Sequence, residues 1–102
     1  MIRVTQTADG DPLEFDVAVT DGAGVTQHRV TMARADLDRL AGDAVPPETC
    51  IEAAFRFLLD REPKEAILRR FDVTVISRYF PEFERELPRY LTSGSGPGGH
   101  AA

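Results

Sequence analysis

The sequence lacks the cysteines and the long apolar runs that would mark a secreted or a membrane protein. One cysteine, Cys50, stands among 102 residues, so no intramolecular disulfide can form and a reducing compartment is expected. No apolar run approaches the ~20 residues that a membrane-spanning helix needs. The first residues include charged and polar ones, which leaves no apolar core for a signal peptide. We therefore expect a cytoplasmic protein with no membrane partner.

Motifs of catalytic and metal-binding sites are also missing. The histidines are His28 and His100, and no C-x-x-C, H-x-x-x-H or H-E-x-x-H spacing is present. The glycine-containing segments 9–11 and 21–24 lack the length of an EF-hand loop and the G-x-x-x-x-G-K of a P-loop, and hairpin turns explain both. We expect no catalytic residue, no metal and no cofactor, and we expect that the protein is not an enzyme.

Cys50 and His28 carry the side chains best suited to catalysis or metal binding, but a packing role accounts for both. Cys50 lies on the apolar arc of a predicted helix, where a buried cysteine behaves as a small hydrophobic residue. His28 falls on the apolar face of a predicted sheet, towards its rim, and a hydrogen-bonded, partly buried imidazole is the expected state there. Neither has a sequence neighbour that would complete a catalytic pair.

The charge is acidic overall but unevenly distributed. The net charge is −5, which argues against wholesale attraction to nucleic acid or to an anionic membrane. Residues 1–55 carry −6, residues 56–78 carry +2 and residues 79–102 carry −1. A locally basic segment in an acidic chain is the one asymmetry in the charge pattern.

The N-terminal third predicts a three-stranded antiparallel meander, with strands at about 1–7, 12–20 and 25–32. Apolar residues at positions 13, 15, 17 and 19 alternate strictly with smaller or polar ones. Asp9-Gly10 and Gly22-Ala23 suit two-residue hairpin turns. The second turn predicts the pairs Leu13–Met32, Phe15–Val30 and Val17–His28, and the first predicts Val4–Phe15 and Ile2–Val17.

The same registers predict the polar face and the edges of the sheet. Asp16 should lie between Arg3 and Arg29 on the face away from the core. The edge strands 1–7 and 25–32 carry no obvious protection against pairing with another chain. A homodimer is therefore among the expected partners.

The remainder of the chain reads as helical, around one central helix. Apolar residues cover about two-thirds of the wheel over residues 48–59, so this helix needs cover on two sides. Asp72 is the expected N-cap of a later helix, and Pro88 should kink or end the last one. The predicted helices are 33–41, 47–61, 64–70, 73–80 and a segment from 81 on.

These elements predict an α+β fold. A three-stranded antiparallel meander is followed by a helical C-terminal half packed on one sheet face, with the central helix between the sheet and the shorter helices. Residues 1–91 should form a single domain. Residues 92–102, rich in glycine and serine, should form a disordered tail because they offer too little apolar surface to fold.

Residues 64–80 carry the candidate binding surface. Two short helices with Ala66 and Ile76 ten residues apart resemble a helix-turn-helix, although Arg70 stands where that motif prefers glycine. The aromatic cluster at 79–83 is expected mainly in the core, and any exposed member would form a contact patch beside Arg78. The candidate partner-binding residues are Lys64, Arg69, Arg70, Thr74, Ser77, Arg78 and Tyr79.

Three functions follow in order of preference. The first is a small non-enzymatic cytoplasmic protein-interaction or regulatory module, which contacts another protein through the basic and aromatic face of residues 64–83. The second is a helix-turn-helix-like nucleic-acid-binding regulator that uses residues 64–80. The last is an enzyme whose catalytic groups the fold would gather from distant segments.

Overall fold

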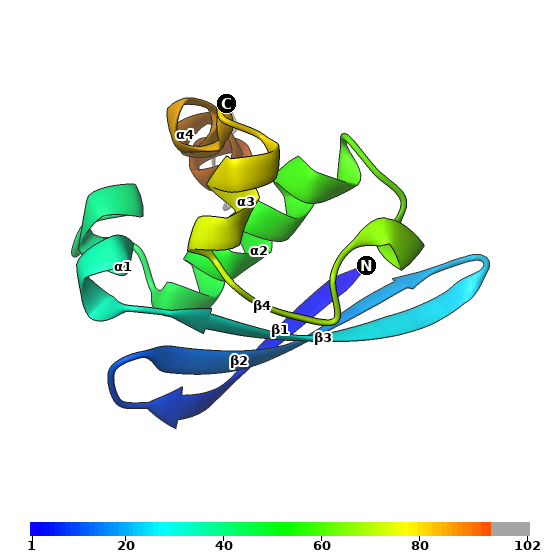
Figure 1. The fold of residues 1–102 in the computed structure, drawn as a ribbon, viewed down its shortest axis with the longest axis horizontal. Helices are drawn as coiled ribbons and strands as arrows, with labels where there is room; N and C mark the ends of the chain where they lie inside the picture. Colours follow the sequence, from blue (N-terminus) through cyan, green and yellow to red (C-terminus); the bar gives the residue numbers. More distant parts are fainter. Residues whose placement is uncertain (95–102) are drawn as a thin grey trace.

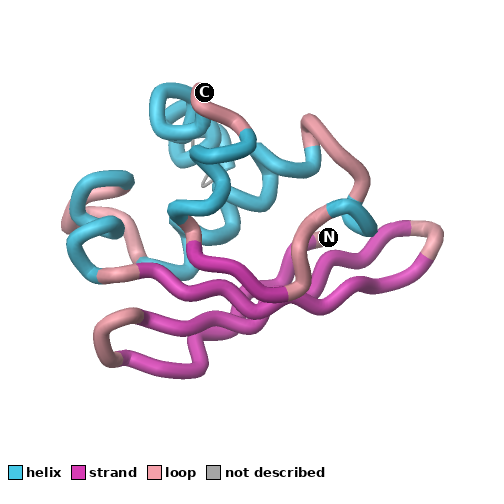
Figure 2. The backbone as a smooth tube through the Cα atoms, viewed as in Figure 1, coloured by secondary structure: helices cyan, strands magenta, loops and turns pink. Residues whose placement is uncertain are grey.

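A four-stranded mixed sheet carries the helices on one of its faces, as the computed structural model shows for residues 1–94 (Figures 1 and 2). The sheet has the strand order β1-β2-β3-β4, with β1, β2 and β3 antiparallel and β4 parallel to β3. The α+β class and the N-terminal meander are therefore as predicted. In chain order the elements are β1 (Ile2–Asp9), β2 (Leu13–Asp21), β3 (Gly24–Met32), α1 (Arg34–Leu40), α2 (Pro47–Leu59), η1 (Lys64–Ala66), β4 (Arg70–Asp72), α3 (Thr74–Tyr79) and α4 (Phe83–Gly94).

The hairpin of β2 and β3 has the predicted register. Phe15 pairs with Val30, and the neighbouring pairs at 13 with 32 and 17 with 28 also follow the prediction. On the opposite face Asp16 pairs with Arg29, and their side chains form an ion pair of 3.0 Å. The alternation of apolar and polar residues therefore identified both faces of this hairpin correctly.

The register of β1 against β2 is two residues away from the prediction. Val4 pairs with Val17 rather than with Phe15, and Ile2 pairs with Val19 rather than with Val17. The predicted two-residue turn does not form, because residues 10–12 connect the strands and the pairing is irregular between residues 6 and 8. A shift by two keeps the same side chains on the core face, so only the partners change.

Two further predictions about the sheet are wrong. Arg3 pairs with Ala18 rather than lying beside Asp16. The strand at 25–32 is not an edge, because β4 pairs with β3 at Arg29, Val30 and Thr31. Among the described strands, the edges are β1 and the three-residue β4.

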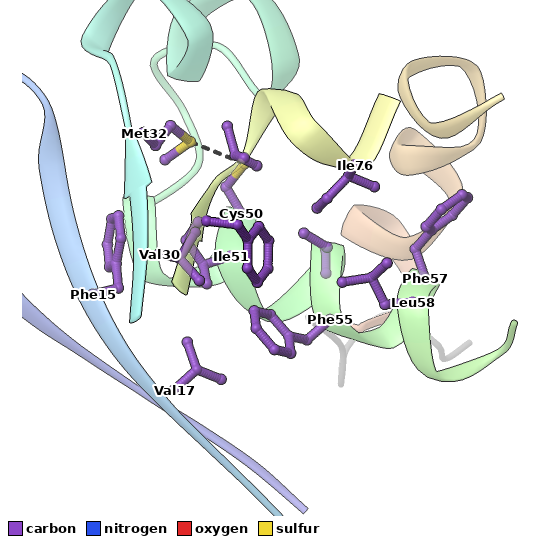
Figure 3. Close-up of a cluster of buried hydrophobic side chains, with 14 of the residues drawn as sticks. Phe15, Val17, Val30, Met32, Cys50, Ile51, Phe55, Phe57, Leu58 and Ile76 are labelled. Atoms are coloured by element: carbon purple, nitrogen blue, oxygen red, sulfur yellow. Dashed lines mark hydrogen bonds between the residues drawn. The ribbon is translucent and has the colours of Figure 1, made fainter. Parts of the chain in front are cut away.

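The helix α2 forms the centre of the core, as predicted. Phe55 packs on the sheet side against the rings of His28 and Phe71, at centroid distances of 5.4 and 6.0 Å. Phe57 packs on the other side, where α4 supplies Phe83 at 5.0 Å. Figure 3 shows residues of α2 between sheet residues such as Phe15 and residues of the later helices. Both phenylalanines of α2 are fully buried, so the central helix is covered on two sides.

The predicted helix at 64–70 is wrong. One 3₁₀ turn, η1, is followed by extended chain that joins the sheet as β4. The Arg29 N–H donates to the Arg69 carbonyl at 2.7 Å, and the Val73 N–H donates to the Thr31 carbonyl at 2.9 Å. The backbone groups of β3 that would otherwise lack partners thus select an extended segment here.

The last two helices differ from the prediction at their ends. α3 is six residues long and its N-cap is Val73, so the prediction of Asp72 as the N-cap is wrong by one residue, although the Asp72 carboxylate accepts the Thr74 N–H at 3.1 Å. α4 continues through Pro88, because the buried Phe83 and Leu87 hold its apolar face against the core. Residues 92–94 of the predicted tail belong to α4, and its remaining residues, 95–102, lie outside the described residues. No helix within residues 1–94 is long and apolar enough to cross a membrane.

Candidate functional site

An apolar groove opens between the end of α2, the segment that leads into β4, and α3. Its volume of about 390 Å³ falls in the usual range for ligand pockets. We call it the β4–α3 groove. It is lined by Leu58, Glu62, Ala66, Ile67, Leu68, Phe71, Val75, Ile76, Tyr79 and Phe80.

Two large side chains at the groove are exposed. Leu68 is 47% exposed and Tyr79 is 67% exposed, whereas Ile67, Phe71 and Ile76 are buried beneath them. Scattered single apolar residues are normal on a protein surface, but these two share one concave site. The β4–α3 groove therefore offers a partner both a cavity and an exposed apolar rim.

His28 fixes the wall of the groove that Leu68 belongs to. Its Nδ1 lies 2.8 Å from the Leu68 carbonyl oxygen, and its Nε2 lies 2.8 Å from the Thr26 hydroxyl. Because a carbonyl can only accept, the proton of a neutral ring lies on Nδ1, and the Thr26 hydroxyl donates to Nε2. The predicted hydrogen bonding of His28 is confirmed, the ring is buried rather than partly buried as predicted, and it also ties β3 to the segment 66–69.

Asp72 fixes the other end of the same segment. Its carboxylate accepts hydrogen bonds from the Thr31 hydroxyl at 2.6 Å and from the Thr74 hydroxyl at 2.7 Å. Burial acts to raise the pKa of Asp72, but the hydrogen bonds outweigh it and hold the pKa below its ordinary value. The segment between η1 and α3 is thus anchored by His28 at one end and by Asp72 at the other.

Of the three charged residues that follow α2, Asp60 and Arg61 have side-chain partners and Glu62 has none within residues 1–94. Asp60 accepts a hydrogen bond from the Tyr90 hydroxyl, and Arg61 donates to Glu82 at 3.0 Å. Glu62 lines the groove, and within residues 1–94 its carboxylate has no hydrogen bond or ion pair. Burial raises the pKa of Glu62 above its ordinary value.

The predicted basic residues lie on different surfaces. Arg70 occupies the same sheet face as Arg29, because the two are paired across β3 and β4, and this face is opposite to the core and the helices. Arg69 and Arg78 are exposed next to the groove residues Leu68 and Tyr79 in the chain. Of the predicted residues, Tyr79 therefore lines the groove, Arg69 and Arg78 are chain neighbours of residues that line it, and Arg70 lies on the opposite sheet face.

The other predicted partner-binding residues are largely engaged inside the protein. The side chain of Lys64 is buried, and its ammonium group contacts the carboxylates of Asp21, at 2.9 Å, and Glu65. Hydrogen bonds to Glu65 and Asp21 raise the pKa of Lys64. Thr74 donates to Asp72, and Ser77 is half-buried. With residues 64–72 mostly non-helical, the two-helix motif predicted for 64–80 does not form.

The core position of Cys50 is as predicted. The residue is fully buried, its Sγ lies 4.0 Å from the Sδ of Met32 (Figure 3), and burial raises its pKa to about 11. A thiol of this kind is protonated and shielded at neutral pH. The part of the chain that the structure describes holds no cluster of three histidine, cysteine or acidic side chains that could bind a metal.

Sequence reasoning did not single out Glu62 or Leu68 as site residues, although both line the groove. Comparisons of the chain with protein-family models, with curated proteins and with solved structures give no match. The functional argument therefore starts from the β4–α3 groove.

Proposed function

We propose that this chain is a small non-enzymatic protein-interaction module of the cytoplasm, which binds an extended or helical segment of a partner protein in the β4–α3 groove. The observation that carries the proposal is an apolar groove of about 390 Å³ with the exposed side chains of Leu68 and Tyr79 at its rim. A partner that inserts one or two apolar side chains would bury this surface, and about 25 cal/mol is gained per Å² of apolar area removed from water.

The residue types at the groove support recognition of a protein. Tyrosine and arginine are favoured anchors at protein interfaces, and Tyr79 lies beside Arg78 in α3. Two short elements, η1 and α3, flank the groove and are joined by the extended segment that contains β4. These elements can hold a partner segment against the end of α2 without any change in the sheet.

The non-enzymatic part of the proposal is supported by the state of the two most reactive side-chain types. Cys50 is buried with a raised pKa, and both ring nitrogens of His28 are used in holding the groove wall. The cytoplasmic part is supported by the same cysteine, since a single buried thiol suits a reducing compartment.

A peptide selection tests the proposal. Random 12-residue peptides displayed on phage would be selected on the immobilised protein, and enriched peptides would be measured by fluorescence anisotropy. We expect Leu68→Ser and Tyr79→Ser to weaken binding at least tenfold, because each removes apolar rim surface. Val25→Ser is the matched control, since Val25 is 55% exposed on β3 but does not line the groove.

The charged rim is tested in the same assay. Arg69→Glu and Arg78→Glu should change the affinity of the selected peptides, whereas Arg70→Glu should leave it unchanged because Arg70 lies on the opposite sheet face. Selection that yields no binder, or binders that tolerate both serine substitutions, would overturn the proposal.

A further inference from the structure

We infer that Glu62 is a specificity-determining residue of the β4–α3 groove, and that the partner segment carries a lysine or arginine directly beside its apolar anchor. The inference rests on the proposed function. It names the chemistry of the partner, which is a basic residue next to the apolar residue that enters the groove.

The position of Glu62 is electrostatically unfavourable in the free protein. It lies just past the C-terminal end of α2, where the helix dipole is negative and favours a cation over a carboxylate. The adjoining charged groups each have a side-chain partner, because Asp60 accepts a hydrogen bond from the Tyr90 hydroxyl and Arg61 forms an ion pair with Glu82. Within residues 1–94 Glu62 alone of these three has no side-chain partner.

The surroundings of Glu62 make a missing partner more costly. The other nine groove-lining residues are apolar except for the hydroxyl of Tyr79, and none of them carries a positive charge. Partial burial in this apolar lining disfavours the ionised carboxylate and raises the pKa of Glu62. A cation brought by the partner would remove this penalty and form a charge-assisted hydrogen bond in a partly desolvated site.

The cations nearest in sequence are not available to Glu62. Arg61 is directed to Glu82, to the Phe57 carbonyl and over the Phe57 ring, whose centroid lies 3.7 Å from the guanidinium carbon. Lys64 is directed to Asp21 and Glu65. The complementary charge for Glu62 is therefore expected from a second molecule, and the apolar lining around it selects a basic residue that stands next to an apolar one.

The test compares peptide selections on three forms of the full chain: wild type, Glu62→Gln and Glu52→Gln. Glu52→Gln is the control because Glu52 is on α2, is paired with Arg56 and does not line the groove. We expect peptides from the wild type and from Glu52→Gln to carry lysine or arginine next to an apolar residue, and peptides from Glu62→Gln to lack this feature.

Affinities then decide the role of Glu62. A selected peptide should bind Glu62→Gln about tenfold more weakly than wild type, and changing its basic residue to glutamine should cause a similar loss on wild type and little loss on Glu62→Gln. Circular dichroism would verify that the variant is folded. Apolar peptides without a basic preference, bound equally by wild type and Glu62→Gln, would overturn this inference and leave the proposed function standing. Failure to obtain any groove-dependent peptide would overturn both.

Discussion

The hydrogen bond from His28 to the Leu68 carbonyl should add a side-chain link between the sheet and the groove wall to the backbone pairing of β3 with β4. Replacing His28 with leucine keeps an apolar side chain of similar size against Phe55 but removes the donor. The Leu68 carbonyl then loses a partner 2.8 Å away in a partly buried site. An unsatisfied buried acceptor costs about 1–3 kcal/mol. The Thr26 hydroxyl can form a hydrogen bond with water instead of with His28 Nε2, so the loss of this second hydrogen bond adds little to the cost.

The variant His28→Asn distinguishes the contribution of the hydrogen bond from that of the aromatic ring. The side-chain amide of Asn can place its NH₂ group where Nδ1 of histidine lies, so His28→Asn retains a donor to Leu68 while the contact with Phe55 is lost. Aromatic contacts of this kind contribute about 0.5–1.5 kcal/mol beyond their buried area. His28→Ala removes both interactions and leaves a cavity, so we expect it to be the least stable of the three variants, with a loss of about 2–4 kcal/mol.

Two measurements test this reasoning. Urea denaturation gives the change in the free energy of unfolding for each variant. Hydrogen exchange reports the local effect, and in His28→Leu we expect faster exchange of the Arg29 N–H, which donates to the Arg69 carbonyl next to Leu68 in the chain. If His28→Leu were as stable as wild type and exchange at Arg29 were unchanged, the groove wall would not depend on this hydrogen bond.

Three further predictions concern the core, the buried lysine and acid stability. Phe57→Ala should lower the free energy of unfolding by about 3–5 kcal/mol in urea denaturation, because it removes a fully buried ring between α2 and α4, and a loss below about 1 kcal/mol would contradict the central position of α2. Lys64, the single lysine of the sequence, should react with an amine-specific acylating reagent far more slowly in the native protein than in urea, as mass spectrometry of its peptide would show, and equal rates would contradict its burial. The pKa of Asp72 is lowered on folding, so its contribution to stability is complete above the unfolded pKa of about 3.9 and is lost as the pH falls through the lower folded value. The difference in unfolding free energy between wild type and Asp72→Asn should therefore shrink as the pH falls below about 4, and a difference that stays constant as the pH is lowered would refute the role of the carboxylate.

The parts of the fold that the sequence predicted are those in which one local period decides the structure. In β2 the alternation of apolar residues decides which side chains face the core. A glycine turn then sets the register of β2 against β3. In α2 the apolar residues exceed one stripe, so burial on two sides follows from the wheel alone. Phe55 and Phe57 then have to face different layers, as they do.

The β1 register and β4 were not predictable from such local patterns. For β1, the connection at 10–12 and the irregularity near Thr7 change the partners while leaving the pattern of faces intact. For β4, the spacing of the apolar residues does not distinguish a helix from a strand, because Ile67 and Phe71 are four residues apart. Residues at i and i+4 share a face both in a helix and in a strand. The choice between the two was made by the free edge of β3, which is remote in sequence.

The β4–α3 groove is a direct consequence of that choice. The extended segment that stands where a helix at 64–70 was predicted supplies Ile67, Leu68 and Phe71 to the lining of the groove. The extended segment reaches the sheet, buries Ile67 and Phe71 beneath it and leaves Leu68 at the rim of a cavity. The candidate site therefore lies where local sequence preference and tertiary pairing disagree, which is where functional surfaces are expected.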